Sequence, residues 1–557
     1  MRVLTCPVAG AAGLLLAVGI IVGPMPAGAS TFGPQTSTFG PQASTGTAIN
    51  AGTGHAVAHS VTVSGAMAGP QAPAQSEPTR TLGRDGKPTG STLPARPSSG
   101  ARPSPASMPI GVGGPNVGQS ATPASLSTGP GMTPASSPQF GFQGITEGSS
   151  DCTNCQTPDV TAALNATEIA ETVNLRLQVS SKAGTTLCTV SLSSLLGAVT
   201  PLSHPRIQYD NAFKRFSFVV DSVPTSSSDV PIQYLATSQA DDACGAWWVY
   251  SLTFFGSSLY PFGATLDYPY LGQDSTSILS STNNFTFGGS YIGSAAYAMP
   301  KSAAYTGDGF SFTPYSVAFS TAPATVAGIP TFSTTNTYWL ASVPGTGYDL
   351  YVMPTNPAGA ISLQAVIRSA FSAPTRRVRQ PGTSQTLDPL DGRIESAPVQ
   401  DGSFVWFAHG VNVNGFPTIR YGAINVGTGQ PFTAVAFHSN TSDDFNPSIG
   451  VSDAGNNTNH IWVNWAYTDT PAGVPVSDTV AGVAPGQGVP NLIGNDLTLI
   501  TGSSTSSISS FGAYSSAEID PVALSPSCPA GLTALTAQEY FTSTGSWTTR
   551  LARTTFC

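Results

Sequence analysis

Short apolar and aromatic runs separated by turn residues fill this chain from about residue 141 to its end. Examples are the runs at 215–220, 247–254, 403–408 and 460–467, with Gly, Pro, Asn or Asp between one run and the next. Hardly any stretch has the length and the amphipathic spacing of a helix. Many short strands with turn signals between them predict a large all-β body built from repeated sheets.

One unit of this body shows its rhythm clearly. A strand beginning near Asn446 runs into an Asp-Ala-Gly-Asn turn that ends at Asn456, and the next strand covers 460–467. The unit resembles the strand-turn-strand element of a propeller blade. At about 55 to 60 residues per unit, residues 141–557 predict one β-propeller of six or seven four-stranded antiparallel blades. The single helix-like stretch is 161–172.

The first 29 residues have the pattern of a signal peptide. Arg2 supplies the positive start, residues 8–23 are apolar, and Ala27-Gly-Ala29 offers small residues at the cleavage position. The apolar stretch is too short and too interrupted by Gly and Pro to span a membrane. We therefore expect a secreted or surface-located mature protein that has no transmembrane helix. We also expect it to be a monomer.

Residues 30–140 consist mainly of Pro, Gly, Ser, Thr and Ala and open on a tandem repeat, 30–36 and 37–43. Such a composition has little apolar surface to bury and cannot offset the entropy lost on ordering. The segment predicts a disordered stalk that precedes the propeller.

The net negative charge of the body argues against nucleic acid as a partner. Residues 146–557 contain 14 Lys and Arg against 27 Asp and Glu, a net charge of −13, while 30–140 carry a net charge of +3. A body this acidic offers no basic groove, so we expect no nucleic-acid partner.

Six cysteines remain once the signal peptide is removed, an even number that favours disulfides in an exported protein: Cys152, Cys155, Cys188, Cys244, Cys528 and Cys557. Cys528 is the simplest partner for the terminal Cys557, whose pairing would hold the chain end. Cys152 and Cys155 lack a second pair at zinc spacing, which favours a local disulfide. The spacing does not choose among the other pairings.

An ordered set of motifs resembles a family of secreted bacterial β-propeller proteins. The set comprises Thr157-Pro-Asp-Val160, Ile169-Ala-Glu-Thr-Val-Asn174, Leu187-Cys-Thr-Val-Ser-Leu192 and His204-Pro-Arg-Ile-Gln-Tyr-Asp210, and it continues to Trp547-Thr-Thr-Arg550. The chain departs from the family pattern at Ser510-Phe-Gly-Ala-Tyr514 and at His204, where the family tends to have Asp. The resemblance covers nearly the whole body and implies the fold and secretion; the family has no agreed enzymatic activity.

Eight polar residues lie at strand ends or in family-like motifs, where a propeller can direct them into its central channel: Asp159, Asn174, Arg206, Asp210, Asp391, Arg393, Glu518 and Asp520. One interpretation makes them a polar site for a sugar. We expect no cofactor; the alternative is a calcium ion bound by Asp oxygens. The competing interpretation is structural, with each Asp or Asn closing a turn and each Arg bridging blades.

Two functions are left open by these patterns. The first is a non-catalytic propeller that binds an extracellular polysaccharide, a surface polymer or a surface protein. The second is a sialidase-like glycoside hydrolase that uses channel carboxylates. Zinc-peptidase, esterase and phosphate-loop motifs are absent from the sequence. Two channel carboxyls about 5 to 10 Å apart, one of them protonated, would favour the enzyme.

Overall fold

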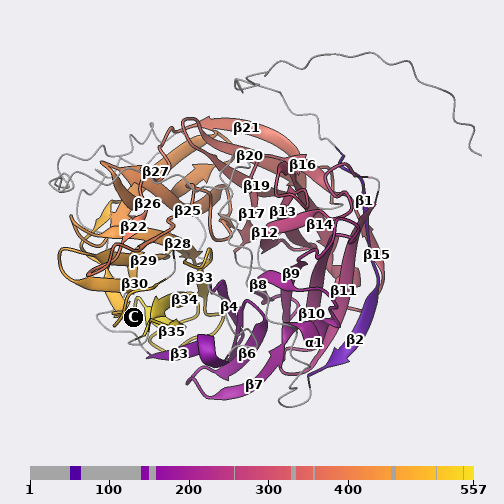
Figure 1. Ribbon diagram of the computed structural model, residues 1–557, viewed down its shortest axis with the longest axis horizontal. Helices are drawn as coiled ribbons and strands as arrows, with labels where there is room; N and C mark the ends of the chain where they lie inside the picture. The colour runs from indigo at the N-terminus through magenta and orange to yellow at the C-terminus, as the bar shows by residue number, and fades with distance from the viewer. Residues whose placement is uncertain are drawn as a thin grey trace, which may run out of the picture. The chain divides into compact units, whose positions relative to one another are not determined.

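A computed structural model gives the structure of residues 50–63, 140–149, 158–255, 257–327, 334–355, 358–452, 459–507, 509, 511–542 and 545–557. These residues fold almost entirely as β-strands (Figure 1). The helical elements among them are one turn or little more: α1 (Leu192–Leu196), α2 (Lys301–Ala304) and the 3-10 turn η2 (Glu147–Ser149). None of these helices has the length and apolar character needed to cross a bilayer.

Five sheets in this part of the chain have four strands each. They are β4 (Val160–Leu164), β5 (Glu168–Val173), β6 (Arg176–Ser181) and β7 (Thr186–Ser191); β12 (Thr265–Gln273), β13 (Ser277–Phe285), β14 (Tyr291–Pro300) and β16 (Tyr315–Val317); β17 (Ala322–Pro323), β19 (Asn336–Val343), β20 (Gly347–Pro354) and β21 (Ser362–Arg368); β28 (Asp443–Val451), β29 (Ile461–Asp469), β30 (Val474–Val483) and β32 (Leu497–Ile500); and β3 (Phe140–Thr146), β35 (Trp547–Thr555), β34 (Thr533–Phe541) and β33 (Ser516–Ile519).

Two further sheets are larger. A seven-stranded sheet contains β8 (Leu202–Asp210), β9 (Arg215–Ser222), β10 (Ile232–Ser238), β11 (Ala246–Phe255), β1 (Thr53–Ala56), β2 (Ala58–Thr62) and β15 (Phe310–Phe312). A six-stranded sheet contains β18 (Thr325–Val326), β24 (Val399–Asp401), β25 (Phe404–Val413), β26 (Phe416–Asn425), β27 (Gln430–Phe437) and β31 (Leu492–Ile493). A small hairpin joins β22 (Val378–Arg379) to β23 (Thr386–Leu387).

The innermost strands of the sheets contact one another in a closed circuit. β4 contacts β8, β8 contacts β12, and β12 contacts β17 and β18; the circuit returns through β24, β28 and β33 to β4. Figure 1 shows the labelled strands β4, β8, β12, β17, β28 and β33 around the middle of this ring. The all-β propeller arrangement predicted from the sequence is confirmed. The predicted number of six or seven four-stranded blades is wrong: five sheets have four strands, because added strands enlarge the other two.

The ring is closed by strands from opposite ends of the body. β3 pairs in antiparallel fashion with β35, so that Phe140 lies opposite Arg553. One sheet therefore combines an N-terminal outer strand with the last three strands of the chain, which leaves no open gap between the first and last sheets.

Residues 53–62 correct part of the predicted stalk. They form β1 and β2, both of which pair with β11, and β1 also pairs with β15. Gly54 lies against the ring of Phe312, and Ala56 and Val63 are buried. This short segment therefore does bury apolar surface, which the composition of the whole stretch conceals. The signal peptide and residues 30–49 and 64–139 of the predicted stalk lie outside the described residues.

The helix-like stretch 161–172 is also corrected, because it forms the hairpin β4–β5. The Asn165 side chain accepts hydrogen bonds from the backbone N–H groups of Thr167 and Glu168 at 2.8 Å each. Asn side chains favour such turns, and this one reverses the chain after β4.

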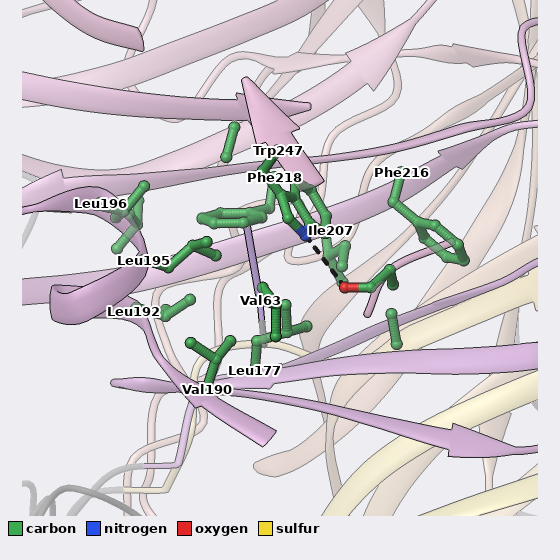
Figure 2. Packing of buried hydrophobic residues seen from close by; sticks show 14 of the residues in the cluster. Val63, Leu177, Val190, Leu192, Leu195, Leu196, Ile207, Phe216, Phe218 and Trp247 are labelled. Carbon is green, nitrogen blue, oxygen red and sulfur yellow. Dashed lines mark hydrogen bonds between the residues drawn. The ribbon is translucent and has the colours of Figure 1, made fainter. Parts of the chain in front are cut away.

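Apolar side chains from neighbouring sheets fill the spaces between them. In Figure 2, Val63 from the N-terminal segment lies near Leu177 and Val190, with Phe218 and Trp247 close by. The Trp247 indole N–H is itself satisfied, since it donates to the Ala243 carbonyl at 3.1 Å. Sheet-to-sheet burial of this kind holds a propeller together.

Two disulfides are present in the described residues. Cys528 pairs with Cys557, which confirms the predicted bond at the chain end, and Cys188 pairs with Cys244. The second bond joins β7 to the segment that precedes β11, and so links two neighbouring sheets. Cys152 and Cys155 lie outside the described residues.

Candidate functional site

Three inner strands carry the same irregularity near their first residues. The pairing register shifts in β8, β12 and β28, where His204, Tyr268 and Asn446 have φ of 58°, 52° and 52°. A proline follows each of the three. Proline has no N–H to donate to a strand partner, so it fits a bulge where the ladder is interrupted. Positive φ is uncommon outside glycine and costly for a bulky residue such as Tyr268, and such backbone strain is found preferentially at functional sites.

Arg206 follows the first of these bulges, and its side chain contacts residues of other sheets. Its Nε donates to the Pro269 carbonyl and its Nη2 to the Glu395 carbonyl, both at 3.0 Å. The guanidinium lies 3.3 Å from the centre of the Tyr514 ring. These partners belong to β12 and to the segments that lead into β24 and β33. Arg206 therefore joins four sheets.

At the end where the inner strands begin, His204 lies between two carboxyls. Its Nε2 is 3.6 Å from Asp159 and 3.7 Å from Asp267, whose side chains are 2% and 29% exposed. The two oxygens that face His204 are therefore at most about 7 Å apart, an upper limit that is compatible with the carboxyl separations of glycosidases. Burial raises the pKa of Asp159, against the opposing effect of His204. Asp159 also accepts the Ala513 N–H at 2.9 Å.

Other polar groups at this end are engaged with each other. Arg393 makes a bidentate pair with Asp391 at 2.8 and 2.9 Å and lies over the Tyr268 ring, 4.5 Å from its centre. Burial alone would raise the pKa of Asp391, but the Arg393 charge and hydrogen bonds outweigh it and lower that pKa. Asn174 accepts the backbone N–H of Asp159 at 2.9 Å.

Arg206 also lines a cavity of about 400 Å³. Its lining runs from the middle of the inner strands to their last residues and consists mainly of hydroxyl-bearing and small apolar side chains. These include Thr161, Thr325, Ser396, Ala397, Ile449, Val451, Ser515, Ser516 and Ala517. The two carboxyls of the lining, Glu518 and Asp520, are contributed by β33 and the residue just after it.

The two carboxyls differ in their surroundings. Asp520 pairs with Lys182 at 2.8 Å and with Arg553 at 2.7 Å. The Glu518 side chain makes no hydrogen bond or ion pair with any residue that the structure describes. Burial raises its pKa to about 8. Glu518 is therefore a protonated and unengaged carboxyl at neutral pH.

The eight residues chosen from the sequence are thus divided between the cavity and other parts of the molecule. Arg206, Glu518 and Asp520 line the cavity, whereas Asp159, Asn174, Asp391 and Arg393 do not. Asp210 forms an ion pair with Lys301 at 2.5 Å and accepts a hydrogen bond from Tyr305. Asp520 forms ion pairs with Lys182 and Arg553. No group of three or more His, Cys, Asp or Glu side chains within the described ranges is arranged to hold a metal ion.

Sequence reasoning missed the aromatic layer around Arg206 and the position of Asp267. Tyr268 and Tyr270 lie 5.4 and 5.3 Å from the guanidinium, alongside Tyr514. The sequence did contain a signal for the bulges that position these residues, because a proline recurs two residues after the start of each bulge in β8, β12 and β28.

No family model and no curated protein matches the chain. Among solved structures, it is similar to an apocarotenoid oxygenase of Synechocystis (11% identity, 60% of this chain and 73% of that chain, TM-score 0.34). It is also similar to a sialidase of Trypanosoma rangeli (10% identity, 76% of this chain and 57% of that chain, TM-score 0.29). A third similar structure is Drosophila semaphorin 2a (9% identity, 77% of this chain and 76% of that chain, TM-score 0.32). These neighbours include sialidase and other propeller folds; at such low identities and TM-scores they carry no information on function.

Proposed function

We propose that this protein is a secreted, non-catalytic β-propeller that binds an extracellular saccharide in its central cavity. The observation that carries this proposal is the unengaged Glu518 carboxyl in a cavity of about 400 Å³. Cavities of roughly 300 to 1,000 Å³ with a few polar groups among apolar walls are typical ligand sites. The disulfides Cys188–Cys244 and Cys528–Cys557 are compatible with the secretion that the N-terminal sequence predicts.

The chemistry of the cavity favours a neutral ligand rich in hydroxyl groups. A protonated carboxyl offers one O–H donor and acceptor oxygens, which suits a sugar hydroxyl. The neighbouring Ser and Thr side chains can both donate and accept. An anionic sugar would have to be bound by Arg206, which is the one arginine of the lining and already donates to two carbonyls.

Cleavage in this cavity would need a second carboxyl that is free to act as base or nucleophile. Asp520 does not meet this requirement, because Lys182 and Arg553 hold its two oxygens. The cavity therefore has one half of a hydrolytic pair, which is sufficient for binding.

Screening the full-length protein on an array of neutral and acidic glycans tests the proposal. The variant Ala397→Trp places a large side chain in the cavity and should abolish the neutral-glycan signal. Ala472→Trp, in the exposed β29–β30 turn, is the matched control and should leave the signal unchanged. Equal neutral-glycan signals from the two variants would show that the glycan binds outside this cavity.

A glycoside hydrolase is the second candidate function, favoured by the short separation of Asp159 and Asp267. One of these carboxyls is buried with a raised pKa and the other is partly exposed, the combination that retaining or inverting chemistry uses. The test is turnover of aryl glycosides, sialosides included, from about pH 3 to 8. Turnover that disappears in Asp267→Asn, with the fold intact, would establish the enzyme in place of the binder.

A further inference from the structure

A second cavity, of about 450 Å³, lies between β21 and the β26–β27 hairpin. It is separate from the central channel and shares no lining residue with the first cavity. Its lining consists of Arg368, Ser369, Ala370, Arg420, Gly429, Gln430, Pro431 and Thr433. Two of these eight residues are arginines and none is acidic, in a body whose net charge is −13.

Arg420 is held in place within this cavity. Its Nη1 donates to the carbonyls of Ser369 and Ala370 at 3.1 and 3.3 Å. Its Nη2 donates to the hydroxyls of Ser369 and Thr433 at 2.6 and 2.9 Å. The guanidinium is thereby fixed, with its positive charge not neutralised by any carboxylate of the lining. The Ser369 and Thr433 hydroxyls act here as acceptors, so their own hydrogens are free to donate to a ligand.

Arg368 differs, because no residue that the structure describes forms a hydrogen bond or an ion pair with its side chain. It is exposed near the end of β21, so its five N–H donors are available. The cavity thus combines one fixed guanidinium, one free guanidinium, two hydroxyl donors and the Gln430 amide.

We propose that this cavity binds an oxyanion, a carboxylate or a sulfate, carried by an acidic saccharide. A planar guanidinium presents two parallel N–H donors that match the oxygens of such a group. Ser369, Thr433 and Gln430 suit the hydroxyls of the sugar that carries it. The site is independent of the neutral-saccharide cavity and adds a second ligand class.

Calorimetric titration of the full-length protein at low salt tests this site. The probes are an oligogalacturonate, a sulfated oligosaccharide, a neutral oligosaccharide of equal length and inorganic sulfate. Both acidic oligosaccharides should bind, with an affinity that falls as salt rises. The stronger of the two identifies the oxyanion, and inorganic sulfate should compete with it.

Arg368→Gln should weaken binding of the acidic oligosaccharides about tenfold or more, because it removes the free bidentate donor. Arg215→Gln is the matched control, since it removes the same charge from an arginine whose Nη1 is satisfied by the Phe213 and Lys214 carbonyls. Equal affinity in wild type and Arg368→Gln, or equal binding of the neutral oligosaccharide, would overturn the proposal. Loss of acidic binding in Ala397→Trp would also overturn it, by moving the site to the central cavity.

Discussion

The guanidinium of Arg206 lies 3.3 Å from the centre of the Tyr514 ring, and this contact joins β8 to the segment that precedes β33. Arg206 comes from β8, whereas Tyr514 precedes β33 on the other side of β4. A cation over an aromatic face, with two carbonyls accepting its N–H groups, satisfies a charge that would otherwise be costly to bury. The contact links sheets that are not adjacent in the ring.

Arg206→Met should therefore lower the free energy of unfolding by about 2 to 4 kcal/mol, because the Pro269 and Glu395 carbonyls lose their donors. Urea denaturation followed by tryptophan fluorescence measures the loss. Arg215→Met on the next strand should change stability by less than about 0.5 kcal/mol. Equal effects of the two substitutions would show that Arg206 does not join the sheets.

Gly54 tests whether the N-terminal segment belongs to the folded body. A Cβ at this position would lie 2.1 to 2.5 Å from atoms of the Phe312 ring, so Gly54→Val should displace β1. Hydrogen exchange in residues 50–63 should become fast in this variant. Val57→Ala, at a side chain that is 77% exposed, should leave exchange slow. Fast exchange in the wild-type segment would restore the view that this stretch is disordered.

The Cys528–Cys557 disulfide closes a loop of 29 residues in sequence separation. Replacing both cysteines by serine should lower stability by about 3 kcal/mol in the chain-entropy model. Thermal unfolding of the double variant measures this loss, and peptide mapping without reductant identifies the bond. A free thiol at either position in the purified protein would contradict the structure.

Buried carboxyls make stability depend on pH. Burial raises the pKa of Asp221 to about 7 and that of Asp478 to about 8, and both are protonated in the fold at acidic pH. Between the unfolded pKa near 4 and these values, the folded state binds more protons than the unfolded state. Each protonated carboxyl therefore makes its full contribution to the free energy of unfolding below about pH 4, and this contribution is lost as pH rises through 7 to 8.

Urea denaturation at pH 5 and pH 8 should show the larger free energy of unfolding at pH 5, with a slope of at most about 1.4 kcal/mol per pH unit for each group. In Asp221→Asn the decline should be smaller, since the amide cannot ionise and can still accept from Gln233. A free energy of unfolding that rises from pH 5 to pH 8 would contradict these protonation states.

The sequence predicts the class of fold well because alternating apolar strands and turn residues are local signals. The pairing of Cys528 with Cys557 could be predicted because Cys557 is the last residue of the sequence and Cys528 is the cysteine nearest to it along the chain. The number of four-stranded sheets could not, since β1 and β2 join β11 from about 190 residues away, beyond what a local pattern reveals.

The site was harder to predict than the fold. Whether a carboxyl is free depends on its neighbours in space: Glu518 and Asp520 are two residues apart, yet only Asp520 has cationic partners. The arginine cavity was also missed, because Arg368 and Arg420 come from different sheets and share no motif. Sequence spacing does not report such juxtapositions.

The central claim is that Glu518 binds a neutral saccharide as a protonated carboxyl. The most direct test is calorimetric titration of the neutral oligosaccharide with the strongest array signal into wild type, Glu518→Gln and Glu518→Ala, from about pH 5 to 9. We predict that wild type loses affinity as pH rises through about 8, that Glu518→Gln binds independently of pH, and that Glu518→Ala binds at least about tenfold more weakly at pH 5. Equal affinities of all three proteins across this range would contradict the claim.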